Sequence, residues 1–158
     1  MNIVLRPYKL EEFERSLEIR ELSEAERIDH WRGVVASSGE WVDHYLHLAI
    51  VVDALLAGDV QFRRCHWSMP PGALEVGIEL GEQYRGQGIG SQTLRIIRHD
   101  FLTDDVHRIS GSTDKGNIAM IRAFEKAHWS YEGTLRGLFN IEGALRDYVS
   151  YSVIRGDA

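Results

Sequence analysis

The stretch LEVGIELGEQYRGQGIGSQTLRIIRHDF, Leu74–Phe101, decides the fold of this 158-residue chain. Within Leu74–Leu80 apolar residues stand at every second position, which is typical of a β-strand. Gly81–Gly90 is a turn rich in glycine, and in Ser91–Phe101 the apolar residues recur at helical spacing. The sequence therefore predicts a strand, a turn of the size of a phosphate group, and a helix.

The turn has the composition of an anion-binding loop. Gly86, Gly88 and Gly90 lack Cβ atoms, so successive backbone N–H groups can approach an anion at the positive end of the helix, and Arg85 adds a cation. Gln87 stands where a P-loop needs lysine, and the glycine spacing is not that of a dinucleotide-binding turn. A tight connection between strand and helix would also use these glycines, so the pattern alone leaves both interpretations open.

The pattern R-x-x-G-x-G, Arg85–Gly90, resembles the pyrophosphate-binding loop of the GNAT superfamily of acyl-CoA N-acetyltransferases. The likeness extends to members similar to the ribosomal-protein-alanine N-acetyltransferases and covers residues 75–154. It rests on Asn117, Ile121, Arg122, Glu125, Lys126, Trp129, Glu132, Gly133, Arg136, Gly143 and Asp147. Residues 1–70 match only in the order of predicted elements.

The resemblance implies an α/β (α+β) fold, with a mixed, mostly antiparallel sheet of about six or seven strands flanked by about four helices. We expect one N-acetyltransferase domain over residues 1–158. Residues 1–70 would form its acceptor side, and residues 74–130 its acetyl-CoA-binding core. The strands predicted at Leu74–Leu80 and His107–Thr113 should run parallel because a helix connects them.

The resemblance also assigns a cofactor site. The backbone N–H of Ile78 or Leu80 would hold the thioester carbonyl or the pantetheine arm, and Asn117 would contact acetyl-CoA further along. Phe124 occupies the position where many relatives carry a tyrosine that protonates the leaving thiolate, and phenylalanine has no proton to give. The complete set predicted to contact the cofactor is Ile78, Leu80, Arg85, Gly86, Gln87, Gly88, Ile89, Gly90, Asn117 and Phe124.

Two glutamates are candidates for the general base. Glu75 and Glu79 are four residues apart on the predicted strand and share a face with Gly77. Partial burial and mutual repulsion would raise the pKa of at least one carboxyl toward the range of a useful base. Glu79 is closer to the loop, whereas Glu75 matches the strand glutamate of some relatives. A surface carboxylate pair is the alternative.

The expected reaction is direct transfer of an acetyl group to a primary amine of a small molecule, such as an antibiotic or a polyamine, or of a protein N-terminus. Residues 1–80 hold eight Lys and Arg against 14 Asp and Glu, whereas residues 81–158 hold ten of each. The acidic first half fits a cationic acceptor and argues against a nucleic-acid partner, although it could also serve solubility. A non-catalytic acyl-CoA-binding regulatory module is the alternative function, and Phe124 supports it.

Composition limits the remaining possibilities. The chain is 44% apolar, contains one cysteine, Cys65, and shows neither a signal peptide nor a membrane-spanning run. We therefore expect a cytoplasmic protein without a membrane partner, with Cys65 packed in the interior. His44 and His47 with Asp43 lack a further ligand at fixed spacing, so no metal site is expected. The oligomeric state stays open, a homodimer among the options.

Local signals suggest several helix ends and turns. Ser23 and Glu26 have capping-box spacing at the start of a helix, and Asn117 is a candidate N-cap. Asp53 and Gly58 would bracket a hairpin turn. His128 stands where relatives have a glycine after the helix, at a position that often needs a left-handed backbone.

Overall fold

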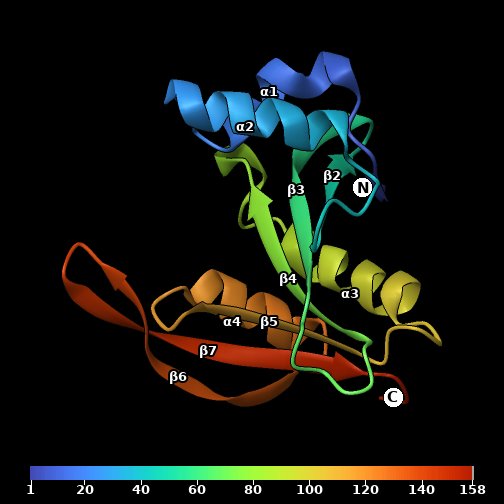
Figure 1. Ribbon diagram of the computed structural model, residues 1–158, viewed down its shortest axis with the longest axis vertical. Coiled ribbons are helices and arrows are strands. Elements are labelled where there is room, and N and C mark those ends of the chain that lie inside the picture. Colours follow the sequence, from blue (N-terminus) through green and yellow to red (C-terminus); the bar gives the residue numbers. More distant parts are fainter. Residues whose placement is uncertain (158) are drawn as a thin grey trace. The chain divides into compact units, whose positions relative to one another are not determined.

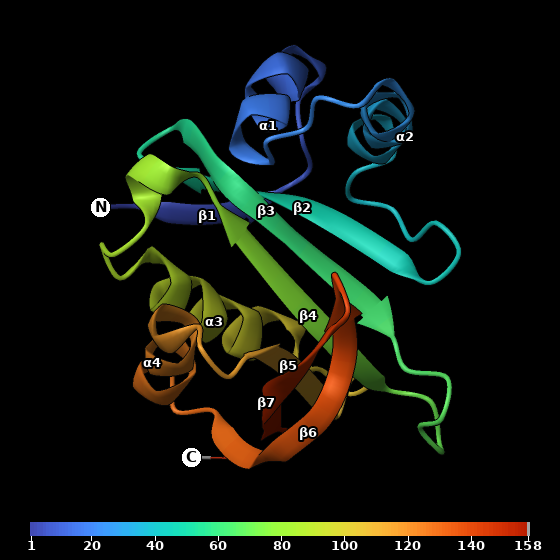
Figure 2. The ribbon, with the colours of Figure 1, turned by 90° about the vertical axis from the view of Figure 1, so that its left-hand side faces the viewer.

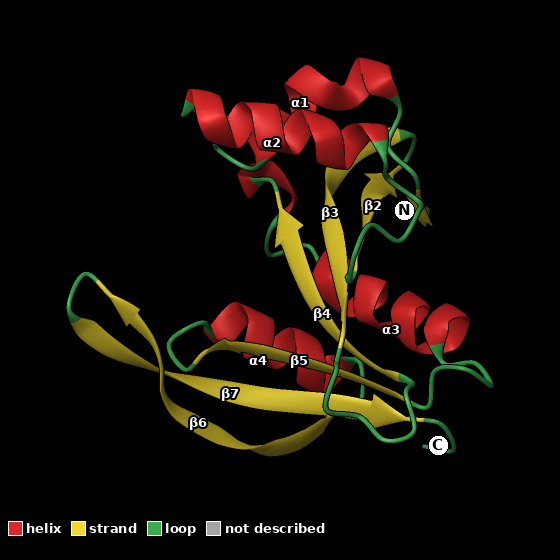
Figure 3. Ribbon diagram, in the orientation of Figure 1, coloured by secondary structure: helices red, strands yellow, loops and turns green. Residues whose placement is uncertain are grey.

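The computed structural model describes residues Met1–Asp157, shown in Figures 1 and 3. Its strands and helices, in chain order, are β1 (Ile3–Arg6), α1 (Phe13–Ile19), α2 (Ala25–Ala36), β2 (Tyr45–Val52), β3 (Leu55–Arg64), β4 (Ala73–Leu80), α3 (Ile89–Phe101), β5 (Arg108–Asp114), α4 (Ile118–Lys126), β6 (Ser130–Ile141) and β7 (Ala144–Ile154). Two 3-10 turns, Leu10–Glu12 and Glu82–Tyr84, complete the list. The seven strands form one mixed sheet in the order β1-β2-β3-β4-β5-β7-β6. This arrangement confirms the predicted fold class.

The chain divides into two compact units. The first consists of Met1–Arg63 and Gly77–Ile89, and the second begins with Arg64–Val76 and continues from Gly90 onward. The division cuts the central strand β4 and places the glycine turn with the N-terminal residues. The single domain expected from the sequence stays a prediction.

In the first unit, three strands of the sheet carry two helices on one side. β1 pairs with β2 and β2 with β3, both antiparallel, and Figure 2 shows α1 and α2 on the same side of these strands. The core between them contains Tyr8, Phe13, Ile19, Trp31, Val35, Ala49, Val51 and Leu56. The apolar faces of both helices are therefore buried against alternate residues of β2 and β3, as their spacing requires.

Two local predictions in this unit were wrong in detail. The β2–β3 turn is made by Asp53 and Ala54, whose φ angles are 47° and 70°, so β3 already begins at Leu55 and contains Gly58. Positive φ at both central residues is the signature of a two-residue hairpin turn. Helix α2 has Glu24 at its N-cap and no side-chain cap, so the predicted capping box of Ser23 does not form.

Gly58 has a structural reason for lacking a side chain. A Cβ atom built at Gly58 would lie 2.2 Å from the carbonyl oxygen of Glu79. The backbone of β3 thus approaches that of β4 where β4 carries Glu79, and any side chain at Gly58 would force the two strands apart. This close approach positions Glu79 beside the middle of β3.

The second unit contains the rest of the sheet. The start of β4 runs parallel to β5, with Ala73–Glu75 paired to Arg108–Ser110, which confirms the predicted direction. β7 is antiparallel to both β5 and β6. The side chain of Phe124 on α4 packs on this sheet, where it stacks on Tyr151 with ring centroids 4.9 Å apart.

Candidate active site

The glycine turn adopts backbone conformations that favour glycine. φ is 74° at Gly86 and 81° at Gly88, both in the left-handed region. Helix α3 begins at Ile89, directly after the second of these glycines. Residues 85–88 are exposed, so a ligand can reach them. Left-handed glycines directly before a helix agree with the anion-binding turn expected from the sequence, and its binding role stays a prediction.

Arg85 is anchored between β4 and this turn. Its Nε donates a hydrogen bond to the carbonyl oxygen of Leu80, at 2.9 Å. The guanidinium is also close enough to Glu79 to lower the pKa of that carboxyl. The side-chain amide of Gln87 donates to the carbonyl oxygen of Gln83. These two hydrogen bonds thus hold the guanidinium of Arg85 and the side-chain amide of Gln87 in place without a ligand.

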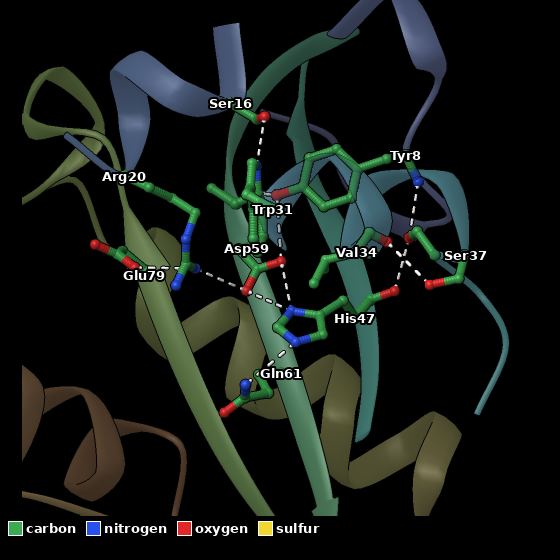
Figure 4. Close-up of polar contacts among 12 residues, drawn as sticks. Tyr8, Ser16, Arg20, Trp31, Val34, Ser37, His47, Asp59, Gln61 and Glu79 are labelled. Carbon is green, nitrogen blue, oxygen red and sulfur yellow. Dashed lines mark hydrogen bonds and ion pairs between the residues drawn. The ribbon is translucent and has the colours of Figure 1, made fainter. Parts of the chain in front are cut away.

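Glu79 shares one guanidinium with a second carboxylate. Nη1 of Arg20 lies 3.0 Å from Oε2 of Glu79 and 3.1 Å from Oδ1 of Asp59. The guanidinium also lies 4.2 Å above the ring centroid of Trp31, a distance typical of a cation–π contact. Figure 4 shows Arg20 between the two carboxylates, so α1, which ends just before Arg20, is tied to both β3 and β4.

The pKa of Glu79 is raised above its ordinary value of 4.5. Burial is the main cause, because it penalises the charged form, and the negative charge of Asp59 adds to it. Arg20 and Arg85 act in the opposite direction but do not outweigh these effects. A half-buried carboxylate with a raised pKa is a better proton acceptor than an exposed one.

Asp59 is the buried centre of this cluster. Its side chain is 2% exposed. Besides Arg20, it is contacted by the hydroxyl of Tyr8, which donates to Oδ2 at 3.2 Å, and by Nδ1 of His47, 3.2 Å from Oδ1. A buried carboxylate is tolerated when its oxygens are paired in this way. Burial and the nearby Asp59 charge raise the pKa of Tyr8 far above its usual range.

The contacts of His47 define its tautomer. Nδ1 faces the carboxylate of Asp59, which can only accept, so the neutral ring carries its proton on Nδ1. Nε2 lies 3.1 Å from Nε2 of Gln61, so the amide of Gln61 donates to it. The edge of the His47 ring also packs against Trp31, with centroids 5.5 Å apart. Asp59, His47 and Gln61 thus form a series of hydrogen bonds that ends on the side-chain amide of Gln61.

The sequence matches the family described as "Acetyltransferase (GNAT) domain" over residues 2–130. The chain belongs to the GNAT acetyltransferase family. This membership confirms the resemblance that the sequence suggested, and with it the enzyme class. The match includes the N-terminal residues, where the motifs gave only the order of elements.

Solved structures share the GNAT fold at low sequence identity. The acetyltransferase (GNAT family) from Bacillus anthracis superposes with a TM-score of 0.78 at 16% identity, over 98% of this chain and 95% of its own. The microcin C7 self-immunity acetyltransferase MccE gives 0.77 at 19%, over 97% and 92%. The ribosomal L7/L12 α-N-protein acetyltransferase RimL gives 0.75 at 19%, over 98% and 94%. A search of curated protein sequences found no match.

Within this GNAT domain the two predicted bases have different surroundings. Glu79 lies in the first unit with Arg20 and Asp59. Glu75 lies in the second unit, where it pairs with Ser110 in the β4–β5 ladder. Ile78 and Leu80, which were predicted to offer backbone N–H groups to the cofactor, flank Glu79 on β4 and are half-buried.

The predicted cofactor contacts on α4 also have structural roles. Asn117 is the N-cap of α4, and its Oδ1 accepts a hydrogen bond from the backbone N–H of Met120 at 3.2 Å, as predicted. Phe124 is 1% exposed, so its ring serves packing. His128 has a φ of 59°, which confirms the left-handed position after the helix.

The cysteine and the histidines that were given no catalytic or metal-binding role from the sequence have the following surroundings. Cys65 is buried, as predicted. His44 is exposed, whereas His47 faces Asp59. Within residues 1–157, no group of three or more His, Cys, Asp and Glu side chains forms a potential metal site, and no helix is long and apolar enough to cross a membrane.

The sequence motifs gave no indication of Asp59, Arg20 or Gln61. One signal was present: Asp59 interrupts the apolar run of β3, LLAGDV, at a strand position flanked by buried residues. A charge at such a position needs polar partners, so Asp59 could have been predicted to be a buried carboxylate with several hydrogen bonds or ion pairs. Its partners could not have been named, because Arg20 is 39 residues away and Tyr8 is 51.

Proposed function

We propose that this GNAT protein transfers an acetyl group from acetyl-CoA to a primary amine, with Glu79 accepting the proton of the amine. The observation that carries the proposal is the position of Glu79, a half-buried carboxylate at the end of β4, paired with Arg20 and directly before the glycine turn. Burial also raises the pKa of this carboxyl. The acceptor is a small molecule, such as an antibiotic or a polyamine, or a protein N-terminus. Among the neighbours, MccE was solved in complex with acetyl-CoA and AMP, and RimL in complex with coenzyme A.

A base matters because only a neutral amine attacks. A lysine-like amine with a pKa near 10.4 is neutral in about one molecule in 2,500 at pH 7, and an α-amine near 8 in roughly one in ten. Glu79 removes the proton as the nitrogen forms its new bond to carbon. Arg20 then stays between the protonated Glu79 and the ionised Asp59, so the cluster keeps a charged pair throughout.

The glycine turn fits the coenzyme. When bound, acetyl-CoA supplies the thioester carbon that the amine attacks and the thiolate that leaves. Gly86 and Gly88 present an exposed turn at the start of α3, and Arg85 provides a fixed cation for the phosphates. The backbone N–H of Ile78 or Leu80 would bind the thioester oxygen, where charge develops. Asn117 and Phe124 stay predictions from the family resemblance.

A direct test measures the release of free CoA thiol with a panel of amines. We expect release that depends on the amine, and a fall of about 10²- to 10⁴-fold in kcat/KM for Glu79→Gln. Glu75→Gln is the matched variant on the same strand, and it should retain most activity if Glu79 is the base. Loss of activity only in Glu75→Gln would transfer the role to that residue.

A second candidate function is a regulatory module that binds an acyl-CoA without turnover. Phe124 favours it, because it stands in place of the tyrosine that would protonate the thiolate. The same assay separates the two functions. Tight binding of acetyl-CoA without thiol release for any amine would indicate a sensor, whereas release would show that the thiolate leaves without a proton from position 124.

A further inference from the structure

A cavity of about 750 Å³ lies in the first unit, between α2 and the strands β2 and β3. Its volume is in the range of small-molecule sites. Residues from α2, from the segment that leads to β2, and from both strands line it, namely His30, Gly33, Val34, Ser37, Glu40, Val42, Asp43, Tyr45, His47, Gln61 and Arg63. None of the motifs in the sequence pointed to this cavity.

The strand wall consists of two cross-strand pairs. Tyr45 is opposite Arg63 and His47 is opposite Gln61 in the antiparallel ladder. Because alternate residues of a strand face the same side, both pairs present their side chains to the cavity. The wall is therefore polar and is fixed by the register of the sheet.

The helix wall leaves room for a ligand. His30, Gly33, Val34 and Ser37 follow the spacing of one helix face, and Gly33 is in the interior of α2. A Cβ atom at Gly33 would meet no atom within 4 Å. Glycine costs about 0.5–1 kcal/mol relative to alanine at such a position, and here it keeps the cavity wide.

The strand wall of the cavity carries a fixed hydrogen-bonding pair, His47 and Gln61. Nε2 of His47 and the amide of Gln61 are 3.1 Å apart, and Figure 4 shows them side by side below Trp31. His47 is held on its other side by Asp59. Since Asp59 also contacts Arg20, which contacts Glu79, one series of contacts joins the cavity to the proposed base.

Glu40 and Asp43 supply two carboxylates to the cavity lining, and Arg63 supplies one guanidinium. The negative charges therefore outnumber the permanent positive charge by two to one. Neither Glu40 nor Asp43 has a side-chain hydrogen bond or ion pair with any described residue. Val34 and Val42 add apolar surface on the same walls. An ammonium group on a short hydrocarbon chain matches this combination of charge and apolar contact.

We propose that this cavity binds the non-reacting, protonated end of a diamine-type acceptor. The proposal rests on the proposed function, because the other amine of the ligand is the one that becomes acetylated. The second ammonium is held by Glu40 and Asp43, and its carbon chain lies against Val34 and Val42.

The test compares α,ω-diamines, from propanediamine to octanediamine, with alkyl monoamines of the same length. We expect diamines to have the higher kcat/KM, and the double variant Glu40→Gln, Asp43→Asn to reduce this preference about tenfold, as two partly exposed ion pairs would. Asparagine tolerates the φ of 52° at Asp43. Glu14→Gln with Glu142→Gln is the control, because it changes the net charge equally at exposed sites outside the cavity.

A second variant acts by volume and does not rely on charge. Gly33→Leu fills the cavity without destabilising α2 and should weaken diamine binding by about tenfold, whereas Ala25→Leu, exposed on the same helix, should not. An unchanged preference for diamines in both cavity variants would overturn the proposal. Calorimetry with the diamines separates diamine binding in the cavity from acetyl transfer. If the wild type gives binding heat that the variants lose, but no amine causes CoA release, the cavity binds diamines and the proposed acetyl transfer is wrong.

Discussion

Arg20 and Glu79 form an ion pair, 3.0 Å between Nη1 and Oε2, although the pKa of Glu79 is raised. The two observations are compatible because the same nitrogen is 3.1 Å from the buried Asp59. One positive charge shared by two carboxylates cannot offset the burial of both. The arrangement keeps Glu79 in place and still leaves it a better base than an exposed glutamate.

Replacing Arg20 should move the pH dependence of catalysis. Arg20 lowers the pKa of Glu79, so Arg20→Gln should raise that pKa further. A base acts only when ionised, and the acidic limb of kcat/KM should therefore shift to higher pH. Arg20→Lys keeps the charge and should shift the limb less. A limb that stays in place in Arg20→Gln would show that another group controls it.

Glu79→Gln should lower activity and raise folding stability. The folded pKa of Glu79 is above its ordinary 4.5, so its full contribution to stability is present below that pH and is lost as pH rises through the folded pKa. Glutamine resembles the protonated form. Thermal unfolding should show Glu79→Gln gaining stability over the wild type between pH 4 and pH 8. The exposed Glu82→Gln should show no such trend, and an equal trend in both variants would count against the burial of Glu79 as the cause.

The buried Tyr8 should make folding stability depend on pH in the alkaline range. Its folded pKa lies above the ordinary 10.0, so its contribution is present below about pH 10 and is lost above it, by up to about 1.4 kcal/mol per pH unit. Tyr8→Phe should cost about 1 kcal/mol at pH 8, because it removes the hydrogen bond to Asp59. Above pH 10 it should lose stability more slowly than the wild type.

Denaturant unfolding from pH 8 to pH 12 measures this difference. Tyr45→Phe is the control, because Tyr45 is 41% exposed and should follow the wild type at every pH. If Tyr8→Phe and the wild type lose stability in parallel above pH 10, the buried hydroxyl of Tyr8 is not the group that titrates.

The sequence predicted those parts of the structure that depend on neighbouring residues. Strand β4, the turn and α3 follow from period and glycine content within Leu74–Phe101, and Asn117 and His128 were placed from their positions at the ends of α4. The β2–β3 turn was misplaced because Gly58 suggested a loop. Position 58 is a glycine because the backbone of Glu79, 21 positions further along the sequence, leaves no room for a side chain there.

The candidate site was predictable only in part for the same reason. Glu79 could be named because it precedes the loop, but its pKa depends on Asp59 and Arg20, which come from other elements. His47 drew attention for its spacing from His44, whereas its actual partners, Asp59 and Gln61, belong to the facing strand. Contacts between strands carry the chemistry here, and local periodicity does not encode them.

The role of the glycine turn can be separated from backbone strain with a matched pair of variants. Gly86 and Gly143 have φ angles of 74° and 83°, and a Cβ atom at either would meet nothing within 4 Å. Alanine should therefore cost each site a similar 1–2 kcal/mol of folding stability. Only Gly86→Ala reshapes the turn before α3, so it alone should weaken acetyl-CoA binding, by about tenfold or more, in calorimetry. Equal affinities in the two variants would mean that the phosphates bind elsewhere on the chain.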